Sequence, residues 1–459
     1  MRHTIKFNAD LIRRYDKSGP RYTSYPTSVQ FNNNFTERRY REIAQEANAS
    51  GRPLSLYFHI PFCNTVCFFC GCSKVVTKDR SRAGPYLRRL HHEIEIQGAL
   101  FDRRRIVDQL HWGGGTPTFI SHDEIRDLMN KIRGHFTLHD DDTGEYSIEV
   151  DPREISESSL PLLRRLGFNR LSMGVQDFNE KVQKAVNRIQ SREQTLSVLK
   201  EARSLGFRSI NMDLIYGLPF QSVASFSETL EQVIAADPDR LSVFNYAHLP
   251  VMFKPQRRIN ADDLPSAEEK LDILQAAIII LGDAGYVYIG MDHFAKPEDE
   301  LAVAQREGSL YRNFQGYSTH ADCDMVAMGI TAISNVGDSF CQNVRTLDEY
   351  YEVLDADRLP VMRGVELSAD DCLRREVIAK LICHFSLDIG AIEKQFEIDF
   401  SHYFAPELEA LTLMQDDGLL TIGGKAIEVL PAGKLLIRNV CMVFDSYLKS
   451  RPQQFSKVI

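Results

Sequence analysis

The feature that most constrains the fold is an alternation of strand-like and helix-like segments between residues 54 and 250. Runs rich in β-branched and aromatic residues predict six strands, at 54–60, 109–112, 146–150, 170–176, 210–216 and 240–248. Helical patterns such as PYLRRLHHEIEIQGAL and REQTLSVLKEARSLG separate them. Strand, helix and strand with short connections favour a parallel sheet covered by helices, either as an open sheet or as a partial barrel.

The residues that follow the strands help to choose between these two architectures. Cysteines, glycines, acids and amides gather there, in the segments PFCNTVC, GGGTPT, EVDPRE, GVQDF, MDLIYGLP and NYAHLP. Chemical groups at the carboxyl ends of many strands fit a barrel mouth better than a single crevice. We therefore predict an α/β fold, a partial (β/α)6 TIM-like barrel over residues 51–310.

The flanking segments predict two further parts. Residues 1–50 form an N-terminal arm that contains the turn-rich SGPRYTSYPT. Residues 311–459 predict a mainly helical, winged-helix-like C-terminal domain with a hairpin at LLTIGGKAIEVL. Winged helices often bind DNA, but residues 366–431 carry 13 Asp and Glu residues against 5 Lys and Arg, which opposes phosphate binding. A structural cap over the barrel mouth is the favoured interpretation.

Composition and charge narrow the class of protein. The 459 residues carry a formal net charge of −9, which argues against nonspecific binding to nucleic acid. No apolar run approaches the roughly 18 to 20 residues that span a bilayer. The first residues, MRHTIKFNADLIRRYDKSGP, lack the apolar core of a secretory signal. These observations predict a cytoplasmic enzyme without membrane or nucleic-acid partners.

Four of the nine cysteines lie within ten residues, at Cys63, Cys67, Cys70 and Cys72. Structural zinc usually needs two separated CxxC knuckles, and no second knuckle follows. A reducing cytosol disfavours a disulfide. An iron–sulfur cluster accepts such spacing because each thiolate binds a different iron. If Cys63, Cys67 and Cys70 bind a [4Fe-4S] cluster, one iron stays open for an external ligand.

The spacing C-x3-C-x2-C after the first strand is similar to that of the radical S-adenosylmethionine superfamily. A closer resemblance comes from motifs that run from the N-terminal arm to the C-terminus: YFHIPFC, CFFCGC, HWGGGTPT, SIEVDPRE, RLSMGVQDF, VNR, DLIYGLP, FNYAHLP, GMDHFA, NFQGY and LLIRNVCMVFDSYL. Together they resemble the oxygen-independent coproporphyrinogen III oxidase family.

The resemblance implies a reaction and its cofactors. The propionates of rings A and B of coproporphyrinogen III become vinyl groups, which gives protoporphyrinogen IX and two molecules of carbon dioxide. A 5′-deoxyadenosyl radical abstracts a hydrogen β to each carboxylate, so two S-adenosylmethionine molecules are expected beside the [4Fe-4S] cluster. An electron donor such as flavodoxin or ferredoxin and a monomeric state are also expected.

The resemblance also implies cofactor-binding residues. Gly114, Gly115 and Thr116 would let the backbone approach S-adenosylmethionine, and Glu149 would accept from ribose hydroxyls. The second S-adenosylmethionine would contact Gln176, Arg188 and Asp213. The adenosyl parts would be lined by Phe69, Ala247 and Ile333.

Three more residues complete the predicted site. Tyr57 and His59 share one face of the first strand by period-two alternation, and His59 stands four residues before the first cluster cysteine. We assign Tyr57 to cofactor binding and His59 to catalysis. Cys72 falls outside the cluster spacing and is predicted to be a substrate-side or second-cofactor residue with a catalytic role.

Two other functions within the superfamily remain open from the sequence. A haem-binding chaperone could retain the cluster without making porphyrin, although the CGC extension, the N-terminal arm and NFQGY at 314–318 argue against it. A radical methyltransferase would lack this arm.

Overall fold

The computed structural model describes residues 5–448, which form two compact units. One unit comprises residues 30–265 and 322–366, and the other comprises residues up to 29 together with 266–321 and 367 onward. The division of the chain into domains 1–50, 51–310 and 311–459 stays a prediction. Each compact unit collects segments that are far apart in the chain.

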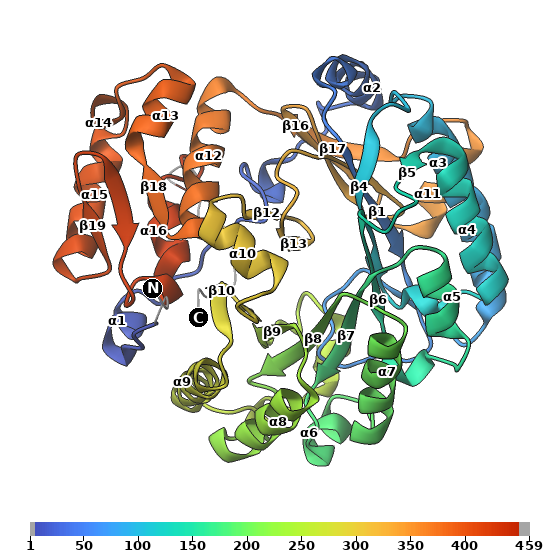
Figure 1. The fold of residues 1–459 in the computed structure, drawn as a ribbon, viewed down its shortest axis with the longest axis horizontal. Coiled ribbons are helices and arrows are strands. Elements are labelled where there is room, and N and C mark those ends of the chain that lie inside the picture. Colours follow the sequence, from blue (N-terminus) through green and yellow to red (C-terminus); the bar gives the residue numbers. More distant parts are fainter. Residues whose placement is uncertain (1–4, 449–459) are drawn as a thin grey trace. The chain divides into compact units, whose positions relative to one another are not determined.

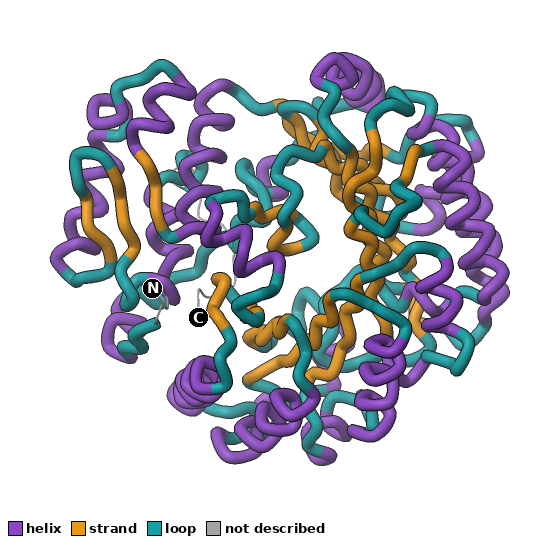
Figure 2. The backbone as a smooth tube through the Cα atoms, viewed as in Figure 1, coloured by secondary structure: helices purple, strands orange, loops and turns teal. Residues whose placement is uncertain are grey.

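Six parallel strands form the centre of the unit that contains residues 30–265, in the order in which they occur along the chain. They are β1 (Leu54–Ile60), β4 (Ile106–Gly114), β6 (Glu145–Val150), β7 (Arg170–Gln176), β8 (Ser209–Tyr216) and β9 (Arg240–Asn245). Their sequence order and parallel pairing are those of the predicted partial barrel of six strand–helix units. In Figure 2 they lie next to one another as a curved sheet.

Helices cover the outer side of these strands, as Figure 1 shows for α3, α4, α5 and α7. The connecting helices are α3 (Ala83–Gly98), α4 (His122–His135), α5 (Ser159–Arg165), α6 (Glu180–Ala185), α7 (Arg192–Ser204) and α8 (Val223–Ala236). The buried side chains Ile125, Leu128, Met129 and Ile132 form one stripe of α4, the spacing expected of a helix packed on a sheet.

Four later strands extend the sheet beyond β1. The strand β14 (Asp324–Met328) pairs with β1 in parallel, and β15 (Ile333–Val336), β16 (Ser339–Asn343) and β17 (Val361–Glu366) follow in antiparallel order. Shorter elements of this unit are α2 (Glu37–Ala47), β2 (Phe62–Cys63), β3 (Val75–Val76), β5 (Thr137–Leu138) and α11 (Leu347–Asp355). Residues 322–366 therefore belong to the sheet, although the sequence analysis did not predict these strands.

The other unit is mainly helical. Its first elements are α1 (Ala9–Arg14), α9 (Ala267–Asp283), β10 (Val287–Gly290), β11 (His293–Ala295), α10 (Glu300–Glu307), β12 (Tyr311–Asn313) and β13 (Gly316–Ser318). Its C-terminal elements are α12 (Ala369–His384), β18 (Ser386–Asp388), α13 (Ile389–Phe396), α14 (Phe400–Tyr403), α15 (Ala405–Asp416), β19 (Leu420–Ile422), β20 (Ala426–Val429) and α16 (Ile437–Val443). The predicted hairpin is β19–β20, which β18 extends to three strands. Among residues 5–448, none of the helices is long and apolar enough to cross a membrane.

Candidate active site

The cysteine-rich loop begins where β1 ends. The short strands β2 and β3 pair in parallel and close the base of this loop. Its tip is held by the turn after α6, because the Phe68 amide donates to the Val186 carbonyl over 2.9 Å and Asn187 Nδ2 donates to the Val66 carbonyl over 2.8 Å. The motif VNR, far away in sequence, thus fixes the backbone that carries the thiols.

A cavity of about 350 Å³ opens beside this loop, at the carboxyl ends of the strands. The predicted residues on its wall are Cys63, Cys67, Phe69, Cys70, Cys72, Gly114, Gly115, Thr116, Glu149, Gln176, Arg188 and Asp213. The other predicted residues, Tyr57, His59, Ala247 and Ile333, are not among its lining residues. The structure therefore brings all four clustered cysteines to one cavity together with most of the predicted cofactor residues.

Polar donors surround the thiols of the loop. Thr116 Oγ1 donates to Cys63 Sγ over 3.7 Å. Lys74 Nζ donates to the carbonyl oxygens of Cys70 and Cys72 over 3.0 and 3.4 Å. A hydrogen bond from the Cys72 thiol and the charge of Lys74 lower the pKa of Cys70, and the contact with Cys70 raises the pKa of Cys72. Cys72 is therefore a direct neighbour of a predicted cluster ligand.

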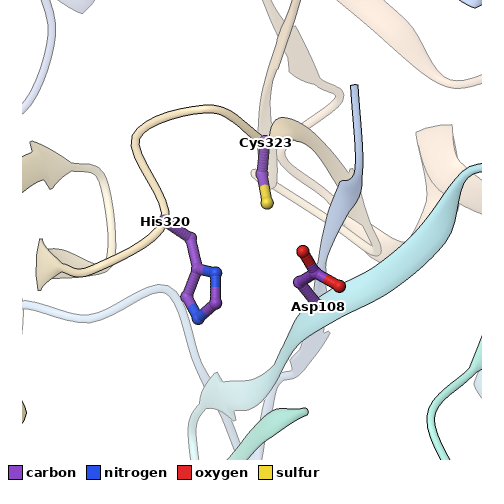
Figure 3. A group of neighbouring side chains, drawn as sticks. All are labelled: Asp108, His320 and Cys323. Atoms are coloured by element: carbon purple, nitrogen blue, oxygen red, sulfur yellow. The ribbon is translucent and has the colours of Figure 1, made fainter. Parts of the chain in front are cut away.

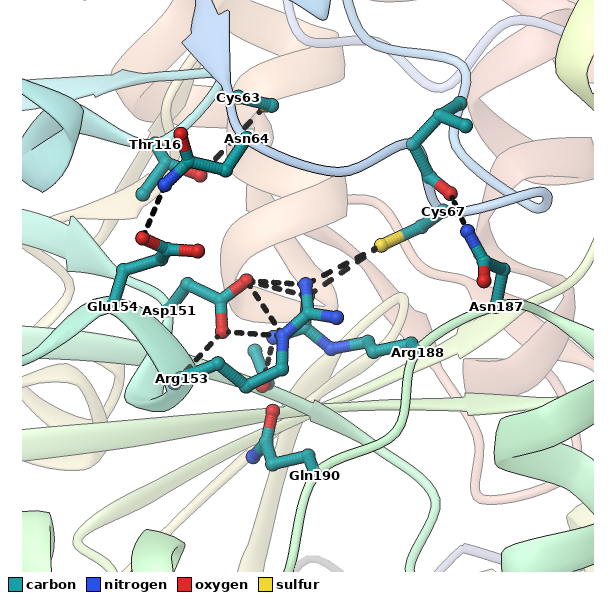
Figure 4. A network of polar contacts seen from close by, with 12 residues as sticks. Cys63, Asn64, Cys67, Thr116, Asp151, Arg153, Glu154, Asn187, Arg188 and Gln190 are labelled. Atoms are coloured by element: carbon teal, nitrogen blue, oxygen red, sulfur yellow. Dashed lines mark hydrogen bonds and ion pairs between the residues drawn. The ribbon is translucent and has the colours of Figure 1, made fainter. Parts of the chain in front are cut away.

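Two guanidinium groups reach the thiol of Cys67 (Figure 4). Arg188 Nη1 lies 3.7 Å from Cys67 Sγ, and Arg153 Nη2 lies 3.8 Å from it. Both groups also bind Asp151, through contacts of 3.0 Å from Arg188 and 2.6 Å from Arg153 to Oδ2. Burial raises the pKa of Asp151, but the two arginines outweigh burial and lower the pKa below its usual value. Asp151 is therefore held ionised.

Tyr57 and His59 form a connected pair on β1. The Tyr57 hydroxyl lies 3.0 Å from His59 Nδ1, and His59 Nε2 lies 3.0 Å from the Ser73 carbonyl oxygen. Because a carbonyl only accepts, Nε2 carries the proton and Nδ1 accepts from Tyr57. Burial lowers the pKa of His59, which keeps its ring neutral. The pair ties the first strand to the end of the cysteine loop.

Glu149 on β6 faces the glycine-rich end of β4. Its Oε2 accepts from the Gly114 amide over 3.1 Å, and its Oε1 lies 3.4 Å from His111 Nε2. Burial raises the pKa of Glu149, but His111 and the Gly114 amide outweigh burial and leave the pKa lowered. An ionised carboxylate with a free lone pair is a suitable acceptor for ribose hydroxyls.

The glycines at the carboxyl end of β4 are required by the protein's own packing. A Cβ on Gly115 would lie 2.7 Å from the backbone of Pro61 and Phe62, where the cysteine loop begins. A Cβ on Gly114, whose φ is +116°, would lie 2.7 Å from the ring of His59. The run GGG therefore lets two strand ends approach each other, in addition to the cofactor contact that the resemblance implies.

Gln176 and Asp213 lie on neighbouring strands. A register shift in β7 between Gly174 and Gln176 leaves Gln176 with a φ of +70°, which redirects its side chain. Asp213 accepts from Asn211 Nδ2 over 2.7 Å, and burial raises its pKa to about 6. Both residues line the cavity on the side of β7 and β8.

Comparisons with known proteins agree with this geometry. Residues 57–233 match the Radical SAM superfamily, and residues 367–436 match the HemN C-terminal domain. A relative from Pseudomonas aeruginosa, named oxygen-independent coproporphyrinogen III oxidase, is 54% identical over 460 residues that cover 100% of both chains. The chain belongs to this family. An Escherichia coli member with the same name is 52% identical over 457 residues, 99% of both chains.

A solved structure of the family has the same fold. The Escherichia coli protein described as "Coproporphyrinogen III oxidase (HemN)", "a Radical SAM enzyme", superposes with a TM-score of 0.93 at 50% identity. The match covers 97% of this chain and 100% of that chain. Members of the superfamily use a [4Fe-4S] cluster and S-adenosylmethionine as cofactors.

The donor set of the cavity fits such a cluster. Cys63, Cys67 and Cys70 converge on one wall, and a hydroxyl, two guanidiniums and a thiol stand beside their sulfurs. Two cations share one carboxylate at Asp151, so positive charge remains to balance sulfur-borne negative charge. Which cysteines bind iron stays a prediction.

Sequence reasoning missed several lining residues: Thr65, Lys74, Pro117, Val150, Asp151, Arg153, Ser172, Gly174 and Phe244. Asp151 and Arg153 stand in the quoted motif SIEVDPRE, directly after β6. Their position after a strand was a usable signal. The contact of Arg153 with Cys67 joins two segments that are more than 80 residues apart in the chain.

Acidic and thiol groups also occur at the opposite edge of the sheet. Figure 3 shows Asp108 near the start of β4 and Cys323 directly before β14, both at amino ends of parallel strands. Burial raises the pKa of the Cys323 thiol, and the carboxylates of its surroundings act in the same direction. His320, also drawn, belongs to the mainly helical unit. Cys323 is therefore remote from the cavity, and its side chain is buried.

Proposed function

We propose that this protein converts coproporphyrinogen III to protoporphyrinogen IX without oxygen, by oxidative decarboxylation of two propionates to vinyl groups. The main support is full-length similarity to proteins named oxygen-independent coproporphyrinogen III oxidase. It is combined with a cavity that the four clustered cysteines line. The substrate is a tetrapyrrole with four carboxylates. Each half-reaction removes one hydrogen atom, one carbon dioxide and one further electron.

The chain's residues would hold the cofactors as follows. Cys63, Cys67 and Cys70 would bind the cluster, and Glu149 with the Gly114 backbone would hold the first S-adenosylmethionine. When reduced, these cofactors supply the 5′-deoxyadenosyl radical that abstracts hydrogen. The hydrogen bonds of Glu149 to Gly114 and His111 already fix its carboxylate before any cofactor binds. Such preorganisation lowers the cost of ordering the site.

A second S-adenosylmethionine would lie toward β7 and β8. Gln176, Arg188 and Asp213 would provide its polar contacts, with Phe69, Ala247 and Ile333 beside the adenosyl parts. The common cavity wall of Phe69, Gln176, Arg188 and Asp213 supports this assignment. Arg188 is already engaged by Asp151 and by the Gly174 carbonyl, so it would serve both the cofactor and the cysteine loop.

His59 and Cys72 are proposed as catalytic residues. Cys72 is exposed and lines the cavity, so its thiol can meet a substrate. His59 would act through its hydrogen-bonded pair with Tyr57, which we place beside the first cofactor. We further propose a monomer in a reducing cytoplasm, reduced by a flavodoxin or a ferredoxin, because a low-potential cluster needs such a donor.

Product analysis under anaerobic conditions tests the proposal. The reconstituted protein, S-adenosylmethionine, a reductant and coproporphyrinogen III should yield protoporphyrinogen IX together with 5′-deoxyadenosine, both measured by chromatography. A protein that makes no vinyl product but binds haem tightly would be the chaperone instead. A methylated product would indicate the methyltransferase.

A further inference from the structure

The cluster loop has an uneven distribution of charge. Cys63 Sγ accepts a hydrogen bond from the neutral hydroxyl of Thr116. Cys67, in contrast, faces the guanidinium groups of both Arg153 and Arg188. Lys74 binds main-chain oxygens of the loop, and its charge also acts on the Cys70 thiol. Among the cysteines of the cavity, Cys67 is the one whose sulfur lies beside two guanidinium groups.

Each arginine joins the cysteine to one carboxylate through a single nitrogen. Arg153 Nη2 contacts both Asp151 Oδ2 and Cys67 Sγ, and Arg188 Nη1 contacts the same two atoms. A guanidinium nitrogen at this position has two hydrogens, so it can donate to both partners at once. Asp151 thereby fixes the direction in which both cations face the sulfur.

Burial makes this arrangement effective. Asp151 is 8% exposed and Arg188 is 7% exposed, so water screens their charges little. The two arginines and Asp151 together carry a net charge of +1 beside Cys67. Positive charge and hydrogen bonds to the sulfurs of an iron–sulfur cluster stabilise its reduced state, which carries one more electron.

We propose that Arg153, held by Asp151 and assisted by Arg188, raises the reduction potential of the cluster through Cys67. Arg153 is a positioning residue, because it acts through Cys67 rather than on the substrate. Its position determines how readily an electron donor reduces the cluster. The inference rests on the cluster and is independent of which tetrapyrrole is the substrate.

Potentiometric titration followed by electron paramagnetic resonance tests this role on the anaerobically reconstituted protein. Arg153→Met should lower the midpoint potential by about 59 mV, a tenfold change in the ratio of reduced to oxidised cluster for one electron. Arg153→Lys, which keeps the charge, should recover most of that loss. Arg80→Met is the matched control, because Arg80 pairs with Glu154 and contacts the Phe119 carbonyl. It should leave the potential unchanged.

A second variant separates charge from disruption. Asp151→Asn removes the negative charge but keeps a side-chain oxygen that can accept from the guanidiniums, so the midpoint potential should rise, opposite to Arg153→Met. If structural damage were the cause, both variants would shift the potential in the same direction, and the proposal would be wrong. An unchanged potential in Arg153→Met with full iron content would also overturn it. If Arg153→Met fails to retain iron, the sign of the shift in Asp151→Asn decides.

Discussion

At the scale of single residues, polar groups in the cavity wall and on the adjoining strand β1 are bound by neighbours within the chain. His59 accepts from Tyr57 and donates to Ser73, and Glu149 accepts from Gly114. Period-two alternation predicted that Tyr57 and His59 share a face, which their hydrogen bond confirms. The partner of His59 Nε2 could not be predicted, because Ser73 returns to β1 only through the folded cysteine loop.

Iron binding should depend on three of the four clustered cysteines and not on the fourth. Cys63→Ala, Cys67→Ala and Cys70→Ala should each prevent reconstitution to about four irons per chain, because three thiolates are the proposed ligands. Cys72→Ser should retain the iron, although its altered contact with Cys70 should change the visible spectrum slightly. Iron analysis and absorbance of the anaerobic protein measure both effects. Loss of iron in Cys72→Ser with retention in any of the other three would contradict the ligand assignment.

Asp213 should link stability to pH. Burial raises its pKa from 3.8 to about 6, so the folded state binds the proton more tightly than the unfolded chain. Its contribution to the free energy of unfolding is therefore present below about pH 4 and is lost as pH rises to about 6. An asparagine carries no charge at any pH, so Asp213→Asn should avoid the cost of burying the ionised carboxylate. The free energy of unfolding should rise by about 1–3 kcal/mol above pH 6.

The same variant should lose function. If Asp213 binds the second S-adenosylmethionine, Asp213→Asn should keep the cluster but suppress vinyl formation, because a neutral amide replaces the charged acceptor. Denaturant unfolding at two pH values and product chromatography measure the two effects. Unchanged product formation would refute the proposed role, whatever the stability.

At the scale of elements, the cavity lies where the carboxyl ends of the parallel strands meet. The ranges of β1 and β7 agree with the predicted segments 54–60 and 170–176, because each is bounded by clear turn residues. The strands β14 to β17 were missed, since they are short and occur after the excursion through residues 266–321. Their assignment to the sheet depends on pairing with β1, a contact across more than 260 residues.

The approach of β4 to β1 predicts an asymmetric effect of two glycine substitutions. Gly115→Ala should destabilise the protein by about 1–3 kcal/mol, because its Cβ would lie 2.7 Å from the backbone of Pro61 and Phe62, and backbone cannot rotate away. Iron incorporation should fall as well. Gly134→Ala, in α4 with nothing within 4 Å, should be neutral or stabilising by up to about 1 kcal/mol. Thermal unfolding of the apoproteins compares them, and equal effects would refute the packing argument.

At the scale of the whole molecule, the compact unit that carries the cavity is assembled from two separate stretches of chain. Residues 30–265 provide the strands of the cavity, and residues 322–366 return to extend the same sheet. A carboxylate at the junction, Glu93 on α3, accepts from Tyr350 over 2.5 Å and from Asn343 over 2.7 Å. The sequence predicted a partial barrel from the alternation of strands and helices and from the residues that follow the strands, and neither pattern carries information about a later return of the chain to the sheet.

The assembled protein should be sensitive to oxygen because of where its loop lies. Cys72 is exposed, as are its neighbours Gly71 and Ser73, so small oxidants have access to the wall that carries the thiols. An iron without a protein thiolate is the point that oxygen attacks first. Brief exposure of the reconstituted protein to air should abolish vinyl formation and release iron, and anaerobic reconstitution should restore both. Paired iron analysis and product chromatography before and after exposure provide the measurement. Sustained turnover in air without S-adenosylmethionine would place the protein in a different class of enzyme.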